Sequence, residues 1–257
     1  MLELQNITKK FMKGTPDETT LFDNFCFSVE KGEFVSVVGS NGSGKTTMLN
    51  LICGTYRPDG GHIVFEGKDI TAMPEHRRAA FIGRVFQDPK AGTCSNLTIL
   101  ENMALADNKN KPFGLGRAVN KKRLDVYRTL LERCDMGMEN RLQTKVGALS
   151  GGQRQALALV IANMTELKLL ILDEHTAALD PKSSERIMEL TDRFVKDSGI
   201  TAIMVTHNLR FAVEYGSRLV MMHQGKAILD KAGEKKKNAS VDDLLTVFNS
   251  ISIELGN

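Results

Sequence analysis

Short runs of alternating apolar and polar residues fill the first part of the chain and predict β-strands. They cover residues 2–7, 21–29 and 62–65, separated by Gly, Pro and Asp. Residues 34–38 are almost continuously apolar, which is typical of a strand that is buried on both faces. The periodicity then changes, and residues 45–53 predict a helix that ends at Gly54.

The middle of the chain has a helical pattern. Thr98 is followed three residues later by Glu101, a capping-box spacing that predicts the start of a helix reaching about residue 106. The helical period resumes over residues 124–134. Between them, residues 108–123 are rich in Gly, Lys and Asn, and a solvated loop is a better interpretation than a binding patch.

The last third of the chain alternates between helices and strands. Ser150 is expected to start a helix whose body, residues 156–162, is apolar nearly all round and therefore buried. Asp180-Pro181 predicts another helix start, because Asp caps well and Pro fits the first helical turn. The remaining predictions are strands at residues 169–172 and 200–205, a hairpin over residues 218–229 that turns at Gln224-Gly225, and a C-terminal helix over residues 241–255. Strand and helix units at both ends, with a helical insert between them, predict an α/β fold with a parallel sheet.

Composition narrows the class of protein. The chain has 257 residues, 34 Lys and Arg against 31 Asp and Glu, and a formal charge of +3, too mild to indicate nucleic-acid binding. No apolar run approaches the ~18 residues of a membrane span, and no secretion signal is visible at the start. The four cysteines are dispersed without a C-x-x-C pair, so we expect buried, reduced thiols in a cytosolic protein.

A phosphate-binding sequence follows the strand at residues 34–38. Residues 39–46, Gly-Ser-Asn-Gly-Ser-Gly-Lys-Thr, fit G-x-x-x-x-G-K-[ST], the P-loop. Its glycines let several backbone N–H groups point at one phosphate chain, and the helix that follows adds its positive end. Lys45 would then pair with the β- and γ-phosphates, and the Thr46 hydroxyl would ligate Mg²⁺.

An acidic pair ends the strand at residues 169–172. Asp173 would emerge at the carboxyl edge of the sheet and hold Mg²⁺, as in a Walker B strand. Glu174 is one residue further on and could orient or deprotonate the water that attacks the γ-phosphate. The alternative interpretation, a surface acidic pair at a strand end, is less favoured because a P-loop lies upstream.

With these motifs, the sequence resembles the ATP-binding-cassette (ABC) proteins. Residues 149–153, Leu-Ser-Gly-Gly-Gln, look like the family's signature and precede the Walker B strand as the family requires. Gln87 matches the Q-loop, residues 178–180 match the D-loop, and His207 matches the switch histidine. The motifs occur in the family's order over residues 35–210.

The resemblance implies a fold and an assembly. It implies a parallel-sheet core of the P-loop NTPase type with an antiparallel β subdomain and a helical insert. The whole chain would be one ATPase domain: core and β subdomain at 1–88 and 151–230, helical subdomain at about 89–165, and a tail at 231–257. Two chains would pair head to tail, each closing its signature over the other's ATP, so that the dimer works as a clamp driven by ATP.

The resemblance also assigns a role to each residue that matches a motif. Glu174, His207 and Gln87 would be catalytic, with Gln87 also linking the nucleotide state to the helical insert. Mg²⁺ would be held by Thr46, Gln87 and Asp173. ATP would be bound by Ser40, Asn41, Gly42, Ser43, Gly44, Lys45, Thr46, Thr47 and Asp180, and by the second chain's Ser150, Gly151, Gly152 and Gln153.

Two positions depart from the family's usual pattern. Adenine is normally stacked on an aromatic residue, often Tyr, near the first strands, and here the candidate is Phe11, which can stack or belong to the core. His175 stands where Pro usually follows the catalytic Glu, and we expect it to alter the loop's geometry rather than its chemistry.

Three kinds of protein carry such a cassette. The first is the ATPase subunit of a transporter, bound to a separate integral-membrane permease on the cytoplasmic face of the cell membrane. Several stretches resemble the bacterial group close to the branched-chain and aromatic amino-acid importers, which work with an extracytoplasmic solute-binding protein; they include residues 93–98 and 173–181. The second is a soluble ATPase of iron–sulfur cluster assembly. The third, a structural-maintenance or DNA-repair ATPase, is disfavoured because the segment between Gln87 and Ser150 is too short for a long coiled coil.

Overall fold

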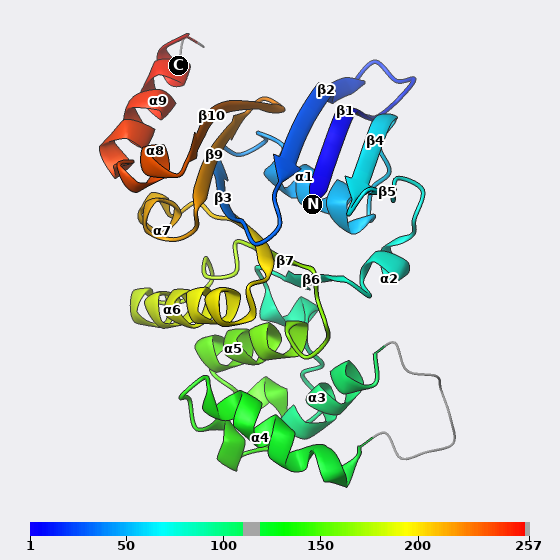
Figure 1. The fold of residues 1–257 in the computed structure, drawn as a ribbon, viewed down its shortest axis with the longest axis vertical. Helices are drawn as coiled ribbons and strands as arrows, with labels where there is room; N and C mark the ends of the chain where they lie inside the picture. Colours follow the sequence, from blue (N-terminus) through cyan, green and yellow to red (C-terminus); the bar gives the residue numbers. More distant parts are fainter. Residues whose placement is uncertain (110–118, 255–257) are drawn as a thin grey trace. The chain divides into compact units, whose positions relative to one another are not determined.

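The computed structural model describes residues 1–109 and 119–254, whose helices and strands are drawn in Figure 1. The chain divides into two units. One comprises Met1–Glu75 and Thr201–Asn257, and the other comprises His76–Ile200. Each unit carries part of the predicted nucleotide site, so each is described in turn.

The N-terminal strands form an antiparallel sheet in the first unit. Its strand order is β2-β1-β4-β5, with bounds Thr19–Val29, Leu2–Phe11, Gly60–Phe65 and Lys68–Asp69. Leu4 pairs with Phe27, and both are buried, while the intervening Glu3 and Ser28 are exposed. This alternation confirms the predicted strands, because period-2 burial places one face of the sheet on the core. β1 extends beyond the predicted end at residue 7, as far as Phe11.

A second set of strands supports the P-loop. Strand β3 (Phe34–Gly39) is buried along its whole length and pairs in parallel with β8 (Thr201–Val205) and β9 (Arg218–His223). β9 returns through the predicted hairpin to β10 (Lys226–Ala232). Gln224 and Gly225 both have positive φ, 43° and 73°, the geometry that a two-residue hairpin turn requires.

Helices cover the strands of the first unit. They are α1 (Lys45–Cys53), α7 (Leu209–Glu214), α8 (Glu234–Lys237) and α9 (Val241–Glu254) (Figure 1). Leu244 of α9 is fully buried in a cluster with Val38 of β3 and Leu219 of β9, so the C-terminal helix belongs to this core. The predicted helix is confirmed as far as Glu254, and Leu255 lies outside the described residues.

The second unit combines two parallel strands with the helical insert. β6 (Ile82–Val85) pairs in parallel with β7 (Leu169–Asp173), which is buried throughout. The α-helices of this unit are α2 (Glu75–Arg78), α3 (Ile99–Asp107), α4 (Leu124–Glu132), α5 (Gly151–Ala162) and α6 (Pro181–Ser198). Short 3₁₀ turns lie at Pro89–Ala91, Lys121–Arg123, Met138–Asn140 and Val146–Ala148.

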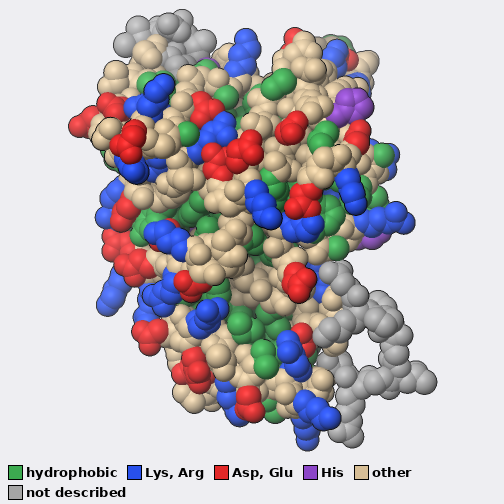
Figure 2. All heavy atoms as spheres, viewed as in Figure 1, with side chains coloured by type: hydrophobic (Ala, Val, Ile, Leu, Met, Phe, Trp, Pro, Cys, Tyr) green, Lys and Arg blue, Asp and Glu red, His purple; other side chains and the backbone are tan. Residues whose placement is uncertain are grey.

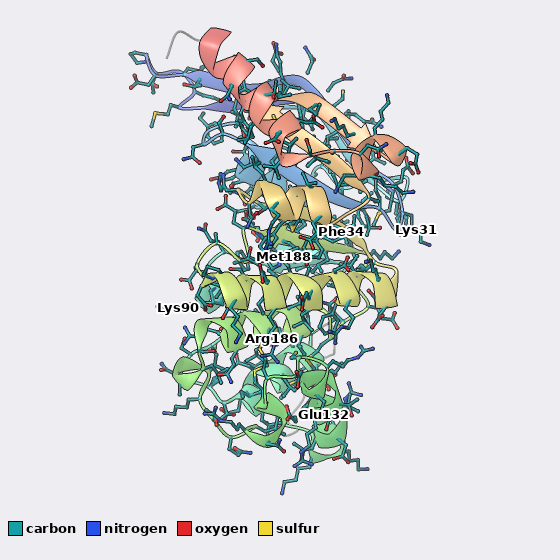
Figure 3. The ribbon with its side chains drawn as sticks, turned by 90° about the vertical axis from the view of Figure 1, so that its left-hand side faces the viewer. Lys31, Phe34, Lys90, Glu132, Arg186 and Met188 are labelled. Atoms are coloured by element: carbon teal, nitrogen blue, oxygen red, sulfur yellow. The ribbon has the colours of Figure 1, made fainter. Side chains whose placement is uncertain are left out.

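Helix α5 is buried because its sides face several neighbours in the second unit. It packs against α3, α4 and α6, and residues 156–160 are all buried, as predicted, whereas Ile161 and Ala162 are half-buried. On α6, Met188 and Arg186 leave the helix toward different sides (Figure 3). Met188 is fully buried, and Arg186 donates to the Asp135 carboxylate at 2.9 Å.

The predictions for the cysteines and for the loop at residues 108–123 are confirmed only in part. The cysteines were expected to be buried; this is true of Cys53 and Cys134 but wrong for Cys26 and Cys94, which are exposed. Cys26 lies on the outward face of β2, between the inward-facing Phe25 and Phe27, so strand alternation explains its exposure. Of the predicted loop at residues 108–123, residues 110–118 lie outside the described residues, and Lys121–Arg123 form a 3₁₀ turn.

Two further observations concern the surface and the length of the helices. On the face drawn in Figure 2, Lys and Arg side chains are interspersed with Asp and Glu. Among the described helices, none combines the length and hydropathy that a membrane-spanning segment needs.

The capping box of α3 provides a test of the fold. Thr98 Oγ1 accepts from Glu101 N at 3.2 Å, and Glu101 Oε2 accepts from Thr98 N at 2.7 Å. Thr98→Ala leaves the Glu101 N–H without its partner and should lower the free energy of unfolding by about 1 kcal/mol in urea titrations. Thr246→Ala, at an exposed position inside α9, is the control and should change it by less than about 0.5 kcal/mol. Equal effects of the two substitutions would contradict the assigned cap.

Candidate nucleotide-binding site

The turn between β3 and α1 has room only for glycine at two positions. Gly39 has φ 154°, and a Cβ there would lie 2.2 Å from the Met222 carbonyl oxygen of β9. Gly44 has φ 103°, and a Cβ there would lie 2.9 Å from the ring of Phe22. The glycines of the predicted P-loop therefore let the backbone pass close to two neighbouring strands.

Lys45 folds back across this turn. Its side chain is buried, and Nζ donates to the carbonyl oxygens of Gly39 and Ser40, each at 2.8 Å. Nζ also lies 3.4 Å from Ser43 Oγ. The ammonium is thus held against the loop, and the first N–H groups of α1 receive no capping side chain from the N-cap Gly44. This arrangement of donors suits an anion such as a phosphate chain.

The end of β8 places His207 at the same edge of the first unit. Val205 pairs with Val37 of β3, and Thr206 N donates to the Val37 carbonyl at 3.1 Å. Because the strands are parallel, His207 follows β8 at the edge where the P-loop follows β3. His207 is exposed at this edge, as a residue that meets a ligand must be.

Phe11 belongs to a small aromatic cluster that the sequence did not reveal. Its ring meets the ring of Tyr56 edge to face, with centroids 5.9 Å apart and planes at 75°. Lys9 Nζ lies 5.5 Å from the Phe11 centroid and 5.8 Å from that of Tyr56. Phe11 is half-buried at the end of β1 and is not part of the closed core.

In the second unit, Gln87 and Asp173 leave neighbouring parallel strands at one edge. Val85 of β6 pairs with Leu172 of β7, so the two chains run out of the sheet side by side. The Asp173 carboxylate does not stand alone: its Oδ2 accepts from Arg84 Nη2 at 2.6 Å. Arg84 was not singled out in the sequence, where it is one basic residue in an apolar strand.

Glu174 has left-handed backbone geometry. Its φ is 48°, unusual for a residue with a side chain, and its carbonyl accepts from Ala177 N at 2.9 Å. Such a conformation costs roughly 1–2 kcal/mol for an L-residue, so neighbouring contacts must hold it. The sharp turn takes Glu174 out of the line of β7 immediately after Asp173.

His175 supplies one of those contacts. It is 2% exposed, and its Nε2 lies 3.1 Å from Thr191 Oγ1 on α6. Thr191 donates its own proton to the Ile187 carbonyl at 2.7 Å, so it accepts from Nε2–H of a neutral imidazole. Burial lowers the pKa of His175 to about 4. The residue that replaces the usual Pro therefore ties the acidic loop to α6. Its effect on the geometry of the loop stays a prediction.

The signature residues form the start of α5. Ser150 is the N-cap: its Oγ accepts from Gln153 N, and Gln153 Oε1 accepts from Ser150 N, both at 3.2 Å. Gln153 Nε2 also donates to the Met136 carbonyl, so its amide braces this turn. Ser150 and Gly151 are exposed, which leaves the helix start accessible to a ligand.

A buried glutamine connects the signature helix to the Q-loop strand. Gln155 is fully buried, and its Nε2 donates to the Phe86 carbonyl, next to Gln87, at 3.2 Å. Asp180, the predicted D-loop residue, caps α6 by accepting from Ser183 N at 3.0 Å. Hydrogen bonds from Ser183 hold the pKa of Asp180 below its ordinary value, so the exposed carboxylate is charged at neutral pH.

Comparison with known proteins decides the family. The sequence profile of the family described as ABC transporter matches residues 22–177, more than half of the chain. The chain belongs to the ABC transporter family. It is an ATPase of that family and binds ATP.

Relatives cover nearly the whole cassette. It is 43% identical to a tyrosine transport ATP-binding protein of Clostridioides difficile (strain R20291), over 96% of this chain and 98% of the relative. It is 30% identical to the xylose/arabinose import ATP-binding protein of Sulfolobus acidocaldarius, over 100% and 98%. A dimeric ATP-binding cassette in a post-hydrolysis state with ADP and Pi matches with a TM-score of 0.76 and 29% identity, over 90% of this chain and 98% of that one.

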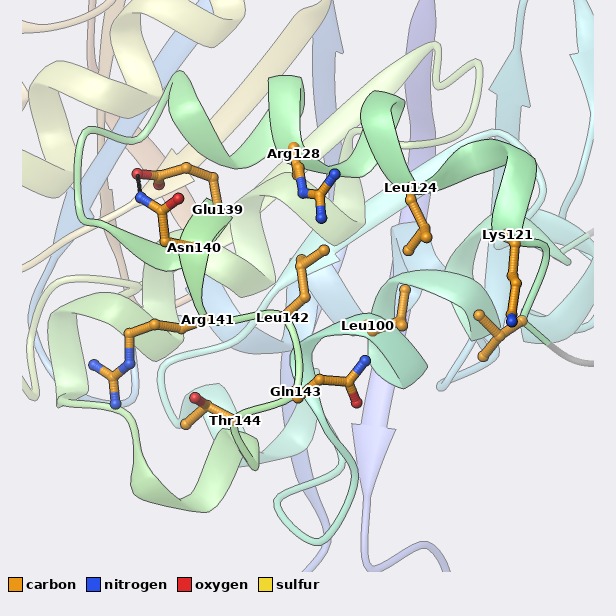
Figure 4. A pocket seen from close by; sticks show the side chains of 11 residues that line it. Leu100, Lys121, Leu124, Arg128, Glu139, Asn140, Arg141, Leu142, Gln143 and Thr144 are labelled. Carbon is orange, nitrogen blue, oxygen red and sulfur yellow. Dashed lines mark hydrogen bonds between the residues drawn. The ribbon is translucent and has the colours of Figure 1, made fainter.

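Two of the hollows formed by described residues lie in the cassette's second unit. One, of about 750 Å³, is lined by β6, the segment after Gln87, α3 and the end of α5. The other, of about 680 Å³, lies between α3, α4 and residues 139–144 (Figure 4). It contains none of the motif residues, and Arg128 and Lys121 extend along its wall.

The pKa of His175 makes the cassette's stability depend on pH in a defined window. The unfolded imidazole takes a proton as the pH falls below about 6.5, while the folded one stays neutral until about 4. Falling pH therefore favours the unfolded chain across this window, by about 3 kcal/mol at most. Urea titrations between about pH 7 and about pH 5 should show a smaller loss of stability for His175→Gln than for the parent chain. Parallel losses would mean that His175 is protonated in the fold.

Proposed function

We propose that this chain is the ATP-hydrolysing subunit of a bacterial importer for amino acids or related small solutes. The observation that carries the proposal is a phosphate loop with a buried, oriented Lys45, in a chain whose β7 ends in the intact acidic pair Asp173-Glu174. The two named relatives are a tyrosine transport and a sugar import ATP-binding protein, which supports the import reading.

The P-loop binds the phosphates of ATP. Lys45 pairs with the β- and γ-phosphates, and residues 40–47 surround them with backbone N–H groups and hydroxyls. Phe11, which packs edge to face with Tyr56, stacks on adenine. His207, exposed beside the P-loop edge, contacts the γ-phosphate.

The donor set of this chain fits Mg²⁺. Thr46 offers a hydroxyl, Gln87 an amide oxygen and Asp173 a carboxylate, the hard oxygen ligands that Mg²⁺ takes together with water and substrate phosphate. No cluster of three or more His, Cys, Asp or Glu that could hold a metal occurs among the described residues. Bound there, the ion would neutralise charge on the phosphates.

Glu174 then orients the attacking water and accepts its proton. Its turn away from β7 takes the carboxylate out of the sheet, and His175 holds that turn through Thr191. Removal of the proton from water makes it a better nucleophile toward the γ-phosphate. Gln87 completes the site at the end of β6.

A second copy of the chain completes each site. The exposed start of α5, with Ser150, Gly151, Gly152 and Gln153, presents N–H groups and a hydroxyl to the partner's ATP. Asp180 borders the same interface. The dimeric structure of a similar cassette supports this pairing, and we infer a homodimer closed by ATP and opened by hydrolysis.

The larger hollow is the docking site for the permease. It includes the exposed apolar side chain of Leu105 on α3, and Lys90 and Lys109 line it without an acidic residue among the described lining residues. Such a groove fits a short segment with an apolar anchor and an acidic group. The chain is thereby held at the cytoplasmic face of the cell membrane. An extracytoplasmic solute-binding protein delivers the solute to the permease. We infer that nucleic acid is not a partner of this chain.

Glu174→Gln tests the catalytic role. The amide cannot accept the water's proton, so turnover of ATP should fall at least about a hundredfold while ATP affinity is retained. Phosphate release and binding of a fluorescent ATP analogue measure the two. Glu132→Gln, an exposed change on α4 (Figure 3), is the control and should leave both unchanged. Turnover that survives in Glu174→Gln would refute the assigned base.

Leu105→Glu tests the permease and its docking groove. A charge at this apolar position should prevent a multi-spanning membrane protein from co-purifying with the tagged chain after detergent extraction. Val126→Glu, at another exposed apolar residue outside the groove, should leave the complex intact. A soluble iron–sulfur scaffold that co-purifies in place of a membrane protein would instead support the cluster-assembly alternative. A complex that survives Leu105→Glu would place the docking surface elsewhere.

A further inference from the structure

Arg84 occupies an unusual position for a charged residue. It lies in β6 between the buried Ile82 and Val85, and only 13% of its side chain is exposed. Its guanidinium stacks near the ring of Phe86, at 4.8 Å from the centroid, and its Nη2 donates to Asp173 Oδ2 at 2.6 Å. Residues 84 and 86 share one face of the strand, which explains the stacking.

The partner carboxylate is equally enclosed. Only 12% of the Asp173 side chain is exposed, so both charges of the pair have lost most of their water. Oδ2 is engaged by Arg84, whereas Oδ1 has no hydrogen-bond partner among the described residues 76–109 and 119–200. One oxygen of the carboxylate is thus fixed by the protein, and the other is left for a ligand.

The pairs of Arg128 with Asp125 and Arg186 with Asp135 also use one carboxylate oxygen but are exposed, whereas a more enclosed pair of the second unit uses both. In the pair of Arg123 with Asp107, both oxygens of the carboxylate accept from the arginine, at 2.9 Å each. That arrangement uses the carboxylate fully and leaves it as a structural tie between α3 and the turn before α4. Arg84 binds Asp173 through one oxygen only, beside the two acidic-loop residues Glu174 and His175.

We propose that Arg84 is a positioning residue that holds Asp173 in the orientation required to bind the water shell of Mg²⁺. A planar guanidinium fixed between an aromatic ring and a carboxylate oxygen restricts rotation of that carboxylate. Partners that orient a ligating carboxylate typically change metal affinity by 10–100-fold when they are removed. Arg84 does not touch the nucleotide in this scheme. The inference rests on the proposed function, in which Asp173 serves the magnesium site.

The contribution of Mg²⁺ to ATP binding tests the proposal. In the Glu174→Gln background, where ATP is not consumed, the Kd of ATP is measured with EDTA and with Mg²⁺. The Kd in EDTA divided by the Kd with Mg²⁺ gives a ratio that reports the metal's contribution to binding. Arg84→Met should lower this ratio about tenfold and leave the Kd in EDTA unchanged. Arg84→Lys restores a point charge without the planar fork and should give an intermediate ratio.

Matched variants separate this role from a structural one. Arg123→Met removes the pair with Asp107 and should leave the ratio unchanged. Asp173→Asn should lower the ratio itself, and adding Arg84→Met to it should have no further effect, because both act through one carboxylate. An unchanged ratio in Arg84→Met, or a weaker Kd in EDTA, would overturn the positioning role. An unchanged ratio in Asp173→Asn would instead overturn the magnesium role in the proposed function.

Discussion

The close approach of the P-loop backbone to its neighbours is the constraint on which the first unit depends. β3 is buried along its length, so its last residue must turn within the core, against Met222 of β9. Only a residue without Cβ can do this, and the turn that results brings the carbonyls of Gly39 and Ser40 to Lys45. A buried ammonium needs several acceptors, and the turn supplies them before any ligand arrives. The phosphate site is therefore preorganised by packing rather than by loop residues alone.

A comparable constraint shapes the second unit. β7 runs into two consecutive carboxylates, which in a regular strand would point to opposite faces. Glu174 instead has left-handed backbone geometry, and the next residue, His175, is anchored to Thr191 by a buried hydrogen bond. Arg84 neutralises one carboxylate of the pair, Asp173, which lessens the repulsion between the two.

Local features of both units could be read from the sequence because neighbouring residues produce them. Helix α1 ends at Gly54 in left-handed geometry, and Thr98 and Ser150 form capping boxes, as their spacing indicates. The pairs Arg84–Asp173, Phe11–Tyr56 and Gln155–Phe86 could not be predicted in this way. Each joins elements far apart in the chain, and its geometry depends on strand register and helix packing, which no local pattern encodes. The same holds for His175, whose partner Thr191 is on the following helix.

The buried hydrogen bond of Gln155 joins the signature helix to the end of the Q-loop strand, two motifs that lie far apart in the sequence. Gln155 is five residues beyond the N-cap Ser150 of the signature, while the Phe86 carbonyl it binds is adjacent to Gln87. A fully buried amide that loses such a partner costs about 1–3 kcal/mol, so the signature helix and the end of β6 resist separation. The same short stretch of β6 also carries Arg84, which reaches Asp173, and borders the groove with Leu105. The groove and the acidic loop thus meet at Arg84, and the signature helix is bonded to Phe86 two residues further along the same strand end.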